Sequence, residues 1–194
     1  MNLQEIKDYA EKNWVPILRD KSANFLCKLI DELKPKNILE IGTCIGYSGI
    51  LMLNACKESF LTTIEIDKNR ALQALKNFKE AKLHKRVTLI NEDAKMVISK
   101  LLNQGKRFDF ILLDGPKGQY INYLPILKKL VAKGGVIFAD DILYHGMVKE
   151  GYPKHKHRTI IFRLREFIDQ ITHDNDLKTQ IYEIEDGFSV SYRK

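Results

Sequence analysis

A loop punctuated by glycines constrains this chain more than any other feature. The apolar run Asn37–Ile41 ends at Gly42, and a helical pattern begins near Gly46. A strand that ends in a glycine loop and leads into a helix allows a ligand to lie close to the backbone, because glycine has no side chain in the way. The glycines are spaced Gly-x3-Gly-x2-Gly, whereas the dinucleotide fingerprint requires Gly-x-Gly-x2-Gly. The spacing therefore disfavours a nicotinamide cofactor at this loop.

Strand and helix patterns alternate along the rest of the chain, which predicts an α/β fold of the doubly wound type. The Asp-Gly turn in Glu185-Asp186-Gly187 predicts a C-terminal antiparallel hairpin beside a mostly parallel sheet, seven strands in all. We expect one domain, 1–194, with a helical N-terminal extension at 1–34. The expected strands are 37–41, 60–66, 87–90, 108–113, 136–139, 177–184 and 188–192. The expected helices are 3–13, 22–33 (capped by Ser22), 47–57, 69–81 (with Leu72, Leu75 and Phe78 facing the core), 93–102 (capped by Asp93), 120–131 and 158–171.

The composition indicates which partners and which cellular compartment suit this chain. The formal net charge is +7 and the pI is about 9.2, which suits an anionic partner such as nucleic acid and equally suits a merely basic soluble enzyme. Three cysteines without a CxxC pair suit a reducing cytoplasm. The sequence shows neither a secretory signal nor an apolar run of roughly 18 residues, so we expect a cytoplasmic protein that does not span a membrane.

Acidic residues stand at the predicted strand ends, where ligands bind in folds of this kind. Glu65 ends the second strand and can accept hydrogen bonds from ribose hydroxyls, or it can simply cap the following helix. Asp93 follows the third strand and can contact an adenine amino group, act as a helix cap, or do both.

Three more carboxylates follow the fourth and fifth strands. Asp114 ends one strand and Asp140-Asp141 end the next, so the three converge if these strands are neighbours. Crowded carboxylates repel unless a cation lies between them, and oxygen ligands suit Mg²⁺ or another hard divalent ion. Lys117 lies three residues beyond Asp114; beside a divalent cation and a sulfonium its pKa would be lowered, as a general base requires. Taken singly, Asp114 also suits a loop start and Lys117 a solvated surface.

Together these motifs resemble the cation-dependent O-methyltransferases of the catechol and caffeoyl-coenzyme A type, over about residues 14–192. The resemblance implies a Rossmann-like fold, S-adenosylmethionine as cofactor, a divalent cation such as Mg²⁺, and a homodimer. Two departures stand out: Asp141 replaces the asparagine common at the third metal ligand, and Cys44 replaces a tyrosine of the animal catechol enzymes. The implied site comprises catalytic Lys117 and Asp114; metal ligands Asp114, Asp140 and Asp141; and cofactor contacts Glu40, Gly42, Tyr47, Ser48, Glu65, Ile66, Asp93, Ala94 and Asp114.

Within that family, Asp-x2-Lys-Gly-Gln-Tyr at 114–120 and an early Val-Pro-Ile look most like the bacterial tRNA 5-hydroxyuridine methyltransferases. That branch implies methylation of the wobble uridine in the tRNA anticodon loop, giving 5-methoxyuridine. Phosphate contacts would come from Lys149, Lys154, Lys156 and Arg158, with Tyr152 available to stack on a base, although the segment also suits a solvated loop. The alternatives are a small-molecule, catechol-like O-methyltransferase and a non-catalytic RNA-binding protein.

Overall fold

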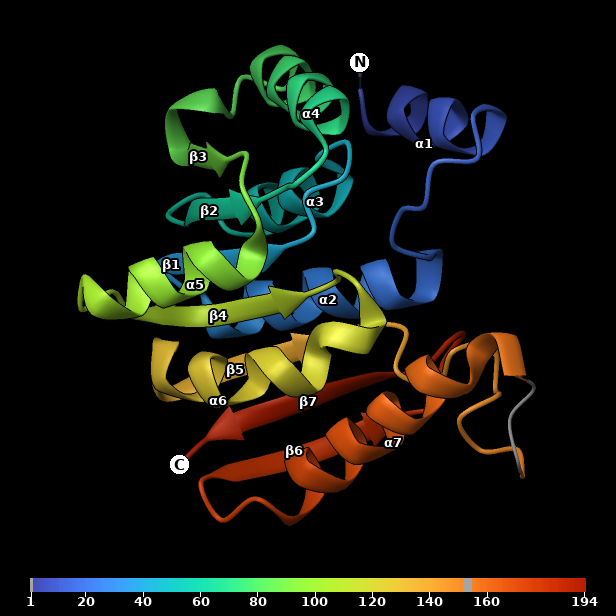
Figure 1. The fold of residues 1–194 in the computed structure, drawn as a ribbon. Coiled ribbons are helices and arrows are strands. Elements are labelled where there is room, and N and C mark those ends of the chain that lie inside the picture. Colours follow the sequence, from blue (N-terminus) through green and yellow to red (C-terminus); the bar gives the residue numbers. More distant parts are fainter. Residues whose placement is uncertain (1, 152–154) are drawn as a thin grey trace. The chain divides into compact units, whose positions relative to one another are not determined.

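The computed structural model describes residues 2–151 and 155–194, and the chain divides after Val97 into two compact units. The first unit contains three parallel strands in the order β3-β2-β1 (Figure 1). Its elements are α1 (Leu3–Lys12), α2 (Asp20–Leu33), β1 (Asn37–Ile41), α3 (Tyr47–Ala55), β2 (Phe60–Ile64), α4 (Lys68–Glu80), the 3-10 turn η1 (His84–Arg86) and β3 (Val87–Ile90). Helix α5 (Ala94–Asn103) runs from the first unit into the second.

The second unit contains four strands in the order β4-β5-β7-β6 (Figure 1). Strands β4 and β5 are parallel, and β7 runs antiparallel to both β5 and β6. Its elements are β4 (Phe108–Leu113), the 3-10 turn η2 (Lys117–Gln119), α6 (Tyr120–Leu130), β5 (Val131–Ala139), the 3-10 turn η3 (His155–His157), α7 (Arg158–His173), β6 (Leu177–Tyr182) and β7 (Phe188–Arg193). The predicted hairpin is therefore confirmed, as are the seven strands in the described residues.

The central strands are buried on both faces, as parallel strands covered by helices usually are. In β1, Ile38, Leu39, Glu40 and Ile41 are all 1% exposed or less, and in β4 the run from Phe110 to Leu113 is completely buried. A polar side chain in such a strand must find its partners inside the protein, because water cannot reach it. This requirement governs the environment of Glu40.

The glycine loop brings α3 close to its neighbours in the first unit. A Cβ on Gly49 would lie 2.7 Å from the Leu61 side chain and 3.0 Å from the Phe78 ring, so only glycine fits there. Gly46, which precedes α3, has a φ of 87°. The glycine spacing that excluded the nicotinamide fingerprint therefore serves helix packing and the entry into α3.

Strands β2 and β6 end at Ile64 and Tyr182, two residues before their expected ends, and three further details of the expected fold are wrong. Helix α2 begins at Asp20, and Ser22 is buried inside it instead of capping it. Leu72 and Leu75 are 56% and 47% exposed, because α4 approaches the first unit through its small residues Ala71 and Ala74 together with Phe78.

The third wrong detail is the start of β5, which lies at Val131 instead of 136. The β4–β5 register shifts between Phe108 and Phe110, so the Gly134-Gly135 pair forms an irregularity inside the strand. A Cβ on Gly135 would lie 2.8 Å from the Asp109 carbonyl oxygen, which explains the glycine. Among the described residues, every helix is too short or too polar to cross a membrane.

Candidate active site

The glycine loop of the first unit is held to the end of β2 by its own backbone. The N–H groups of Gly42 and Thr43 both donate to the Ile64 carbonyl, and Cys44 then adopts a left-handed φ of 47°. That turn directs the Cys44 N–H at Glu65 Oε2, 2.8 Å away, while the Asp67 N–H donates to the other carboxylate oxygen at 2.9 Å. Glu65 is only 7% exposed, so two backbone donors hold its carboxylate in place. Each oxygen keeps a further lone pair for a ligand hydroxyl.

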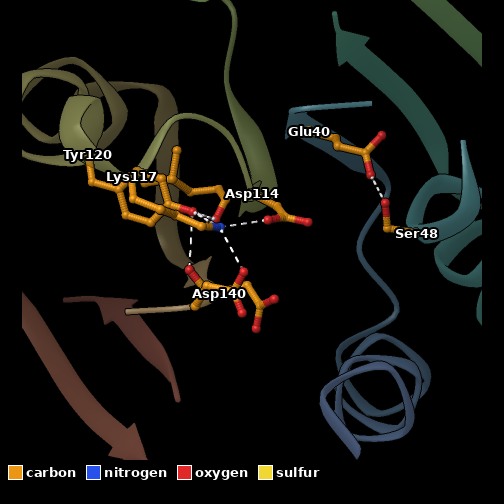
Figure 2. Close-up of polar contacts among 8 residues, drawn as sticks. Glu40, Ser48, Asp114, Lys117, Tyr120 and Asp140 are labelled. Atoms are coloured by element: carbon orange, nitrogen blue, oxygen red, sulfur yellow. Dashed lines mark hydrogen bonds and ion pairs between the residues drawn. The ribbon is translucent and has the colours of Figure 1, made fainter. Parts of the chain in front are cut away.

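A second buried carboxylate, Glu40, is held by hydroxyl groups. Ser48 donates to Glu40 Oε1, as Figure 2 shows, and Thr63 donates to Oε2, both at 2.5 Å. Because the single Thr63 proton goes to Glu40, its contact with the Thr43 hydroxyl at 2.5 Å must be donated by Thr43. Glu40 is fully buried, and these bonds tie β1, β2 and the start of α3 together. Glu40 and Ser48 thus shape the loop, and their contact with a cofactor stays a prediction.

The remaining predicted cofactor residues of the first unit lie at the start of α3 and after β2 and β3, whereas Asp114 follows β4 in the second unit and its cofactor contact stays a prediction. Tyr47 is 8% exposed, and burial raises the pKa of its phenol. Ile66 is 67% exposed after β2, as suits a side chain that a ligand can cover. Asp93 caps α5 by accepting from the Lys95 and Met96 N–H groups, which confirms the predicted cap, and Ala94 is half-buried beside it.

Three aspartates meet at the ends of β4 and β5 in the second unit. One carboxylate oxygen from each of Asp114, Asp140 and Asp141 lies within 4.8 Å of the others; we call these residues the acidic trio. Strands β4 and β5 are neighbours, as the convergence required. Asp141 has a left-handed φ of 54°, which bends the chain just beyond β5 and places two consecutive carboxylates at one point. Asparagine and aspartate are the non-glycine residues that tolerate this conformation best.

Lys117 brings a positive charge to the acidic trio. Its Nζ lies 2.8 Å from Asp114 Oδ1, 3.4 Å from Asp141 Oδ2 and 2.9 Å from the Tyr120 hydroxyl (Figure 2). Burial alone would lower the pKa of Lys117, but the adjacent Asp114, Tyr120 and Asp141 outweigh it and hold that pKa well above its usual range. The expected lowering of this pKa assumed a divalent cation and a sulfonium beside Lys117, and it stays a prediction. It would require the added positive charge of a metal ion and a sulfonium.

The environment of the acidic trio also shifts the pKa values of its carboxyl groups. Burial, reinforced by the neighbouring Asp114 and Asp141, raises the pKa of Asp140 to about 8. Burial raises the pKa of Asp114 as well, although Lys117 opposes it. Three carboxylates against one ammonium leave an excess of negative charge, and their oxygen donors fit a hard divalent cation such as Mg²⁺. Asp114, Asp140 and Asp141 are the residues that would hold it.

The predicted RNA contacts are only partly described. Lys149, Lys156 and Arg158 are exposed, whereas Lys154 and Tyr152 lie outside the described residues. Lys149 forms an ion pair with Glu183, and the Arg158 guanidinium lies 5.8 Å from the Phe162 ring centroid. These three residues stay predictions for RNA binding.

Two residues of the site were missed at the sequence level. Thr63 bonds the buried Glu40; a polar residue in an otherwise apolar strand was the available signal. Tyr120 was quoted only as part of a motif, yet its fully buried hydroxyl contacts Lys117, Leu113 and Asp140. Its three-residue spacing from Lys117, one helical turn, was the signal for that contact.

A glycine-loop α/β unit with a ligand-ready glutamate, and a unit with carboxylates at adjacent strand ends, define a methyltransferase of the Rossmann-like class. The chain belongs to the O-methyltransferase family, whose model matches residues 2–194. It is therefore an S-adenosylmethionine-dependent O-methyltransferase, which sets aside the hypothesis of a non-catalytic RNA-binding protein.

Known relatives agree with this assignment. A protein of Arabidopsis thaliana provisionally named a caffeoyl-CoA O-methyltransferase is 32% identical over 174 residues, 88% of this chain and 75% of that one. A catechol O-methyltransferase of Niastella koreensis is 36% identical over 126 residues, 64% of this chain and 57% of that one. Among solved structures, an O-methyltransferase from Bacillus cereus in complex with S-adenosylhomocysteine (SAH) is 25% identical, with a TM-score of 0.88, over 99% of this chain and 90% of that one.

Proposed function

We propose that this enzyme is a divalent-cation-dependent O-methyltransferase whose acceptor carries two neighbouring oxygens on a flat ring, as a catechol does. The observation that carries the proposal is the convergence of the acidic trio within 4.8 Å beside Lys117. The catechol and caffeoyl-CoA names of its relatives support a small-molecule acceptor. A cation held there would bind paired oxygens and lower the pKa of an acceptor hydroxyl.

The chain's own residues have distinct parts in this reaction. Glu65 is placed to orient the ribose of S-adenosylmethionine, which supplies the methyl group as an activated sulfonium, and the acidic trio would fix the acceptor. Lys117, held as an ammonium by Asp114 and Tyr120, stabilises the oxyanion that forms when the acceptor hydroxyl loses its proton. Its Nζ can take that proton only if added positive charge lowers its pKa. Holding the two reactants in line would provide much of the rate.

Paired oxygens can be tested directly. Catechol, with two adjacent hydroxyls, should be methylated in the presence of S-adenosylmethionine and Mg²⁺, whereas phenol should not. EDTA should abolish the reaction and added Mg²⁺ should restore it. Equal transfer to both acceptors, or full activity in EDTA, would contradict the proposal.

A second acceptor, 5-hydroxyuridine at the tRNA wobble position, is favoured by charge. The chain carries a net charge of +7, and Lys149, Lys156 and Arg158 are exposed beyond the acidic trio in sequence. In 5-hydroxyuridine the hydroxyl adjoins a ring carbonyl, so it offers the same pair of oxygens. Anticodon loops also present unstacked bases, and basic residues bind phosphates.

The two acceptors can be separated in one comparison. Methyl transfer to tRNA lacking the modification is measured against transfer to catechol at equal concentration. Mass spectrometry of tRNA nucleosides from cells with and without this protein gives the cellular result. Unchanged 5-methoxyuridine would remove the tRNA reading and leave the small-molecule one.

We also propose that the enzyme is a cytoplasmic homodimer. Its three cysteines form no disulfide with one another, which fits a reducing compartment. Trp14, between α1 and α2, is 94% exposed. Exposing so large an apolar side chain to water is unfavourable, and a second copy of the chain would cover it. Replacing it, Trp14→Ser, should shift the mass in sedimentation equilibrium towards that of one chain. An unchanged mass would exclude Trp14 from the interface.

A further inference from the structure

A buried tyrosine occupies the position where the acidic trio meets α6. Tyr120 is the first residue of that helix, and its side chain is 0% exposed. Its ring packs edge-on against Phe167 of α7, with centroids 5.4 Å apart and an angle of 70° between the planes. Packing thus fixes the ring, and with it the position of the hydroxyl.

The Tyr120 hydroxyl joins the two strand ends that carry the acidic trio. It lies 2.9 Å from the carbonyl oxygen of Leu113, the residue before Asp114, and 3.1 Å from the carbonyl oxygen of Asp140 itself. The Asp140 N–H also donates to the Leu113 carbonyl at 3.1 Å. The ends of β4 and β5 are therefore joined by one backbone bond and by the Tyr120 hydroxyl, whose single proton is shared between the two carbonyl oxygens. Figure 2 shows Tyr120 beside Asp140.

The same hydroxyl accepts a bond from Lys117 Nζ at 2.9 Å, and that ammonium donates to Asp114 at 2.8 Å. A lysine side chain is flexible, so a second fixed partner is what keeps Nζ beside the carboxylates. The Tyr120 hydroxyl thus contacts both strand ends and the Lys117 ammonium group. Carboxylates this close repel one another. The β4–β5 ladder holds the two backbones together as far as Leu113 and Ala139, and beyond it the Tyr120 hydroxyl contacts the Asp140 carbonyl.

We propose that Tyr120 is a positioning residue of the metal site: its hydroxyl sets the spacing of Asp114 and Asp140 and holds Lys117 Nζ against Asp114. The inference rests on the proposed cation dependence and adds a residue that touches neither cation nor acceptor. Groups that orient metal ligands in this way typically contribute about 10- to 100-fold in affinity.

Tyr120→Phe removes the hydroxyl and keeps the ring. Titration with Mn²⁺, followed by electron paramagnetic resonance, should show affinity reduced by roughly 10-fold or more. SAH affinity, measured by calorimetry without metal, should be unchanged, because Glu65 and the glycine loop belong to the first unit. Tyr123→Phe is the matched control: it lies in the same helix, is 3% exposed, and should leave both affinities at the wild-type value.

The outcomes separate the two proposals. If Tyr120→Phe binds Mn²⁺ as tightly as the wild type, the positioning role is overturned and the cation dependence stands. If the wild type binds no Mn²⁺, both are overturned. Should Tyr120→Phe fail to bind SAH and so report a fold defect, Phe167→Leu loosens the ring without removing the hydroxyl. It should weaken Mn²⁺ binding by a smaller factor, and a folded Phe167→Leu with wild-type affinity would overturn the positioning role.

Discussion

The two units hold buried carboxylates in opposite ways. In the first unit, hydroxyls of Ser48 and Thr63 donate to Glu40, and two backbone N–H groups donate to Glu65. In the second unit, Asp114, Asp140 and Asp141 face one another, with Lys117 as the ammonium beside them. Glu40 and Glu65 are stabilised by neutral hydrogen-bond donors. The acidic trio is stabilised by the single positive charge of Lys117, which does not balance three carboxylates.

The carboxylates of the first unit therefore have their partners within the protein, whereas the acidic trio depends on an added ion. Two backbone donors hold the Glu65 carboxylate in place, so it can accept hydrogen bonds from ligand hydroxyls without rearrangement. Three carboxylates and one ammonium, all ionised, carry a net charge of −2, which a divalent cation would neutralise. Uncompensated charge of this kind is costly to a folded protein. Carboxyl groups with shifted pKa values cluster at functional sites.

The largest expected effect is the loss of one member of the acidic trio. Asp140→Ala removes a buried carboxylate of the proposed cation site and relieves repulsion, so the fold should survive while cation binding is lost. We expect methyl transfer to fall by on the order of 10³-fold, equivalent to several kcal/mol of transition-state stabilisation. Initial rates with a saturating acceptor measure this loss, and Mn²⁺ titration measures the loss of binding.

Asp176→Ala is the matched control, because Asp176 is an exposed aspartate of the same unit, 71% exposed. It should keep the wild-type rate. SAH affinity should be the same in wild type and Asp140→Ala. A rate within a few-fold of wild type for Asp140→Ala would show that the acidic trio is not the reacting centre.

In the first unit, the corresponding change should affect stability instead of chemistry. Glu40→Ala leaves the Ser48 and Thr63 hydroxyls without their acceptor and opens a cavity, which we expect to cost about 3 kcal/mol of unfolding free energy. Urea unfolding measures it, with the exposed Glu58→Ala as control. Mn²⁺ affinity of the folded protein should not change, since the acidic trio lies in the second unit; a parallel loss of Mn²⁺ binding would break the distinction.

Glu65→Gln sharpens the role of the ligand-ready carboxylate. The amide turns an NH₂ group towards one of the two backbone donors, Cys44 or Asp67, and removes a charged acceptor. Because a hydrogen bond to a charged group contributes roughly 1.5–3 kcal/mol, SAH affinity should fall about 10- to 100-fold. Calorimetry of Glu65→Gln beside Glu58→Gln tests this, and equal affinities would remove Glu65 from the cofactor site.

Much of the fold and the convergence of the acidic residues could be predicted from the sequence, because polar or turn residues clearly mark the ends of the strands. Strands β1, β3 and β4 match their expected bounds residue for residue, since each is a short apolar run bounded by polar or turn residues. Parallel strands end at a common edge, so acids at their ends could be expected to meet. The match to the family then gave the reaction.

What could not be predicted depends on backbone conformation and close packing. The left-handed backbone at Cys44 and Asp141 places an N–H donor and a carboxylate. Cysteine gives no sign of such a φ, and aspartate, although it tolerates this conformation, adopts it at few positions. Leu72 and Leu75 have the spacing of a buried stripe but are exposed, because close approach by Ala71 and Ala74 decides which face of α4 is buried. The contacts of Tyr120 join residues from β4, β5 and η2, which only the folded chain brings together.

The smallest expected effect is a pH dependence that Mn²⁺ binding at the acidic trio should show and SAH binding should not. Burial and the neighbouring carboxylates raise the pKa of Asp140 to about 8, so at lower pH a proton occupies the group and a cation must displace it. Mn²⁺ affinity should therefore rise with pH, by at most tenfold per unit for one proton, and level off above about 8. SAH affinity measured without metal over the same range should stay flat, because Asp140 is not among the predicted cofactor contacts. Affinity for Mn²⁺ that does not change between about pH 6 and 8 would mean that the acidic trio is already ionised there.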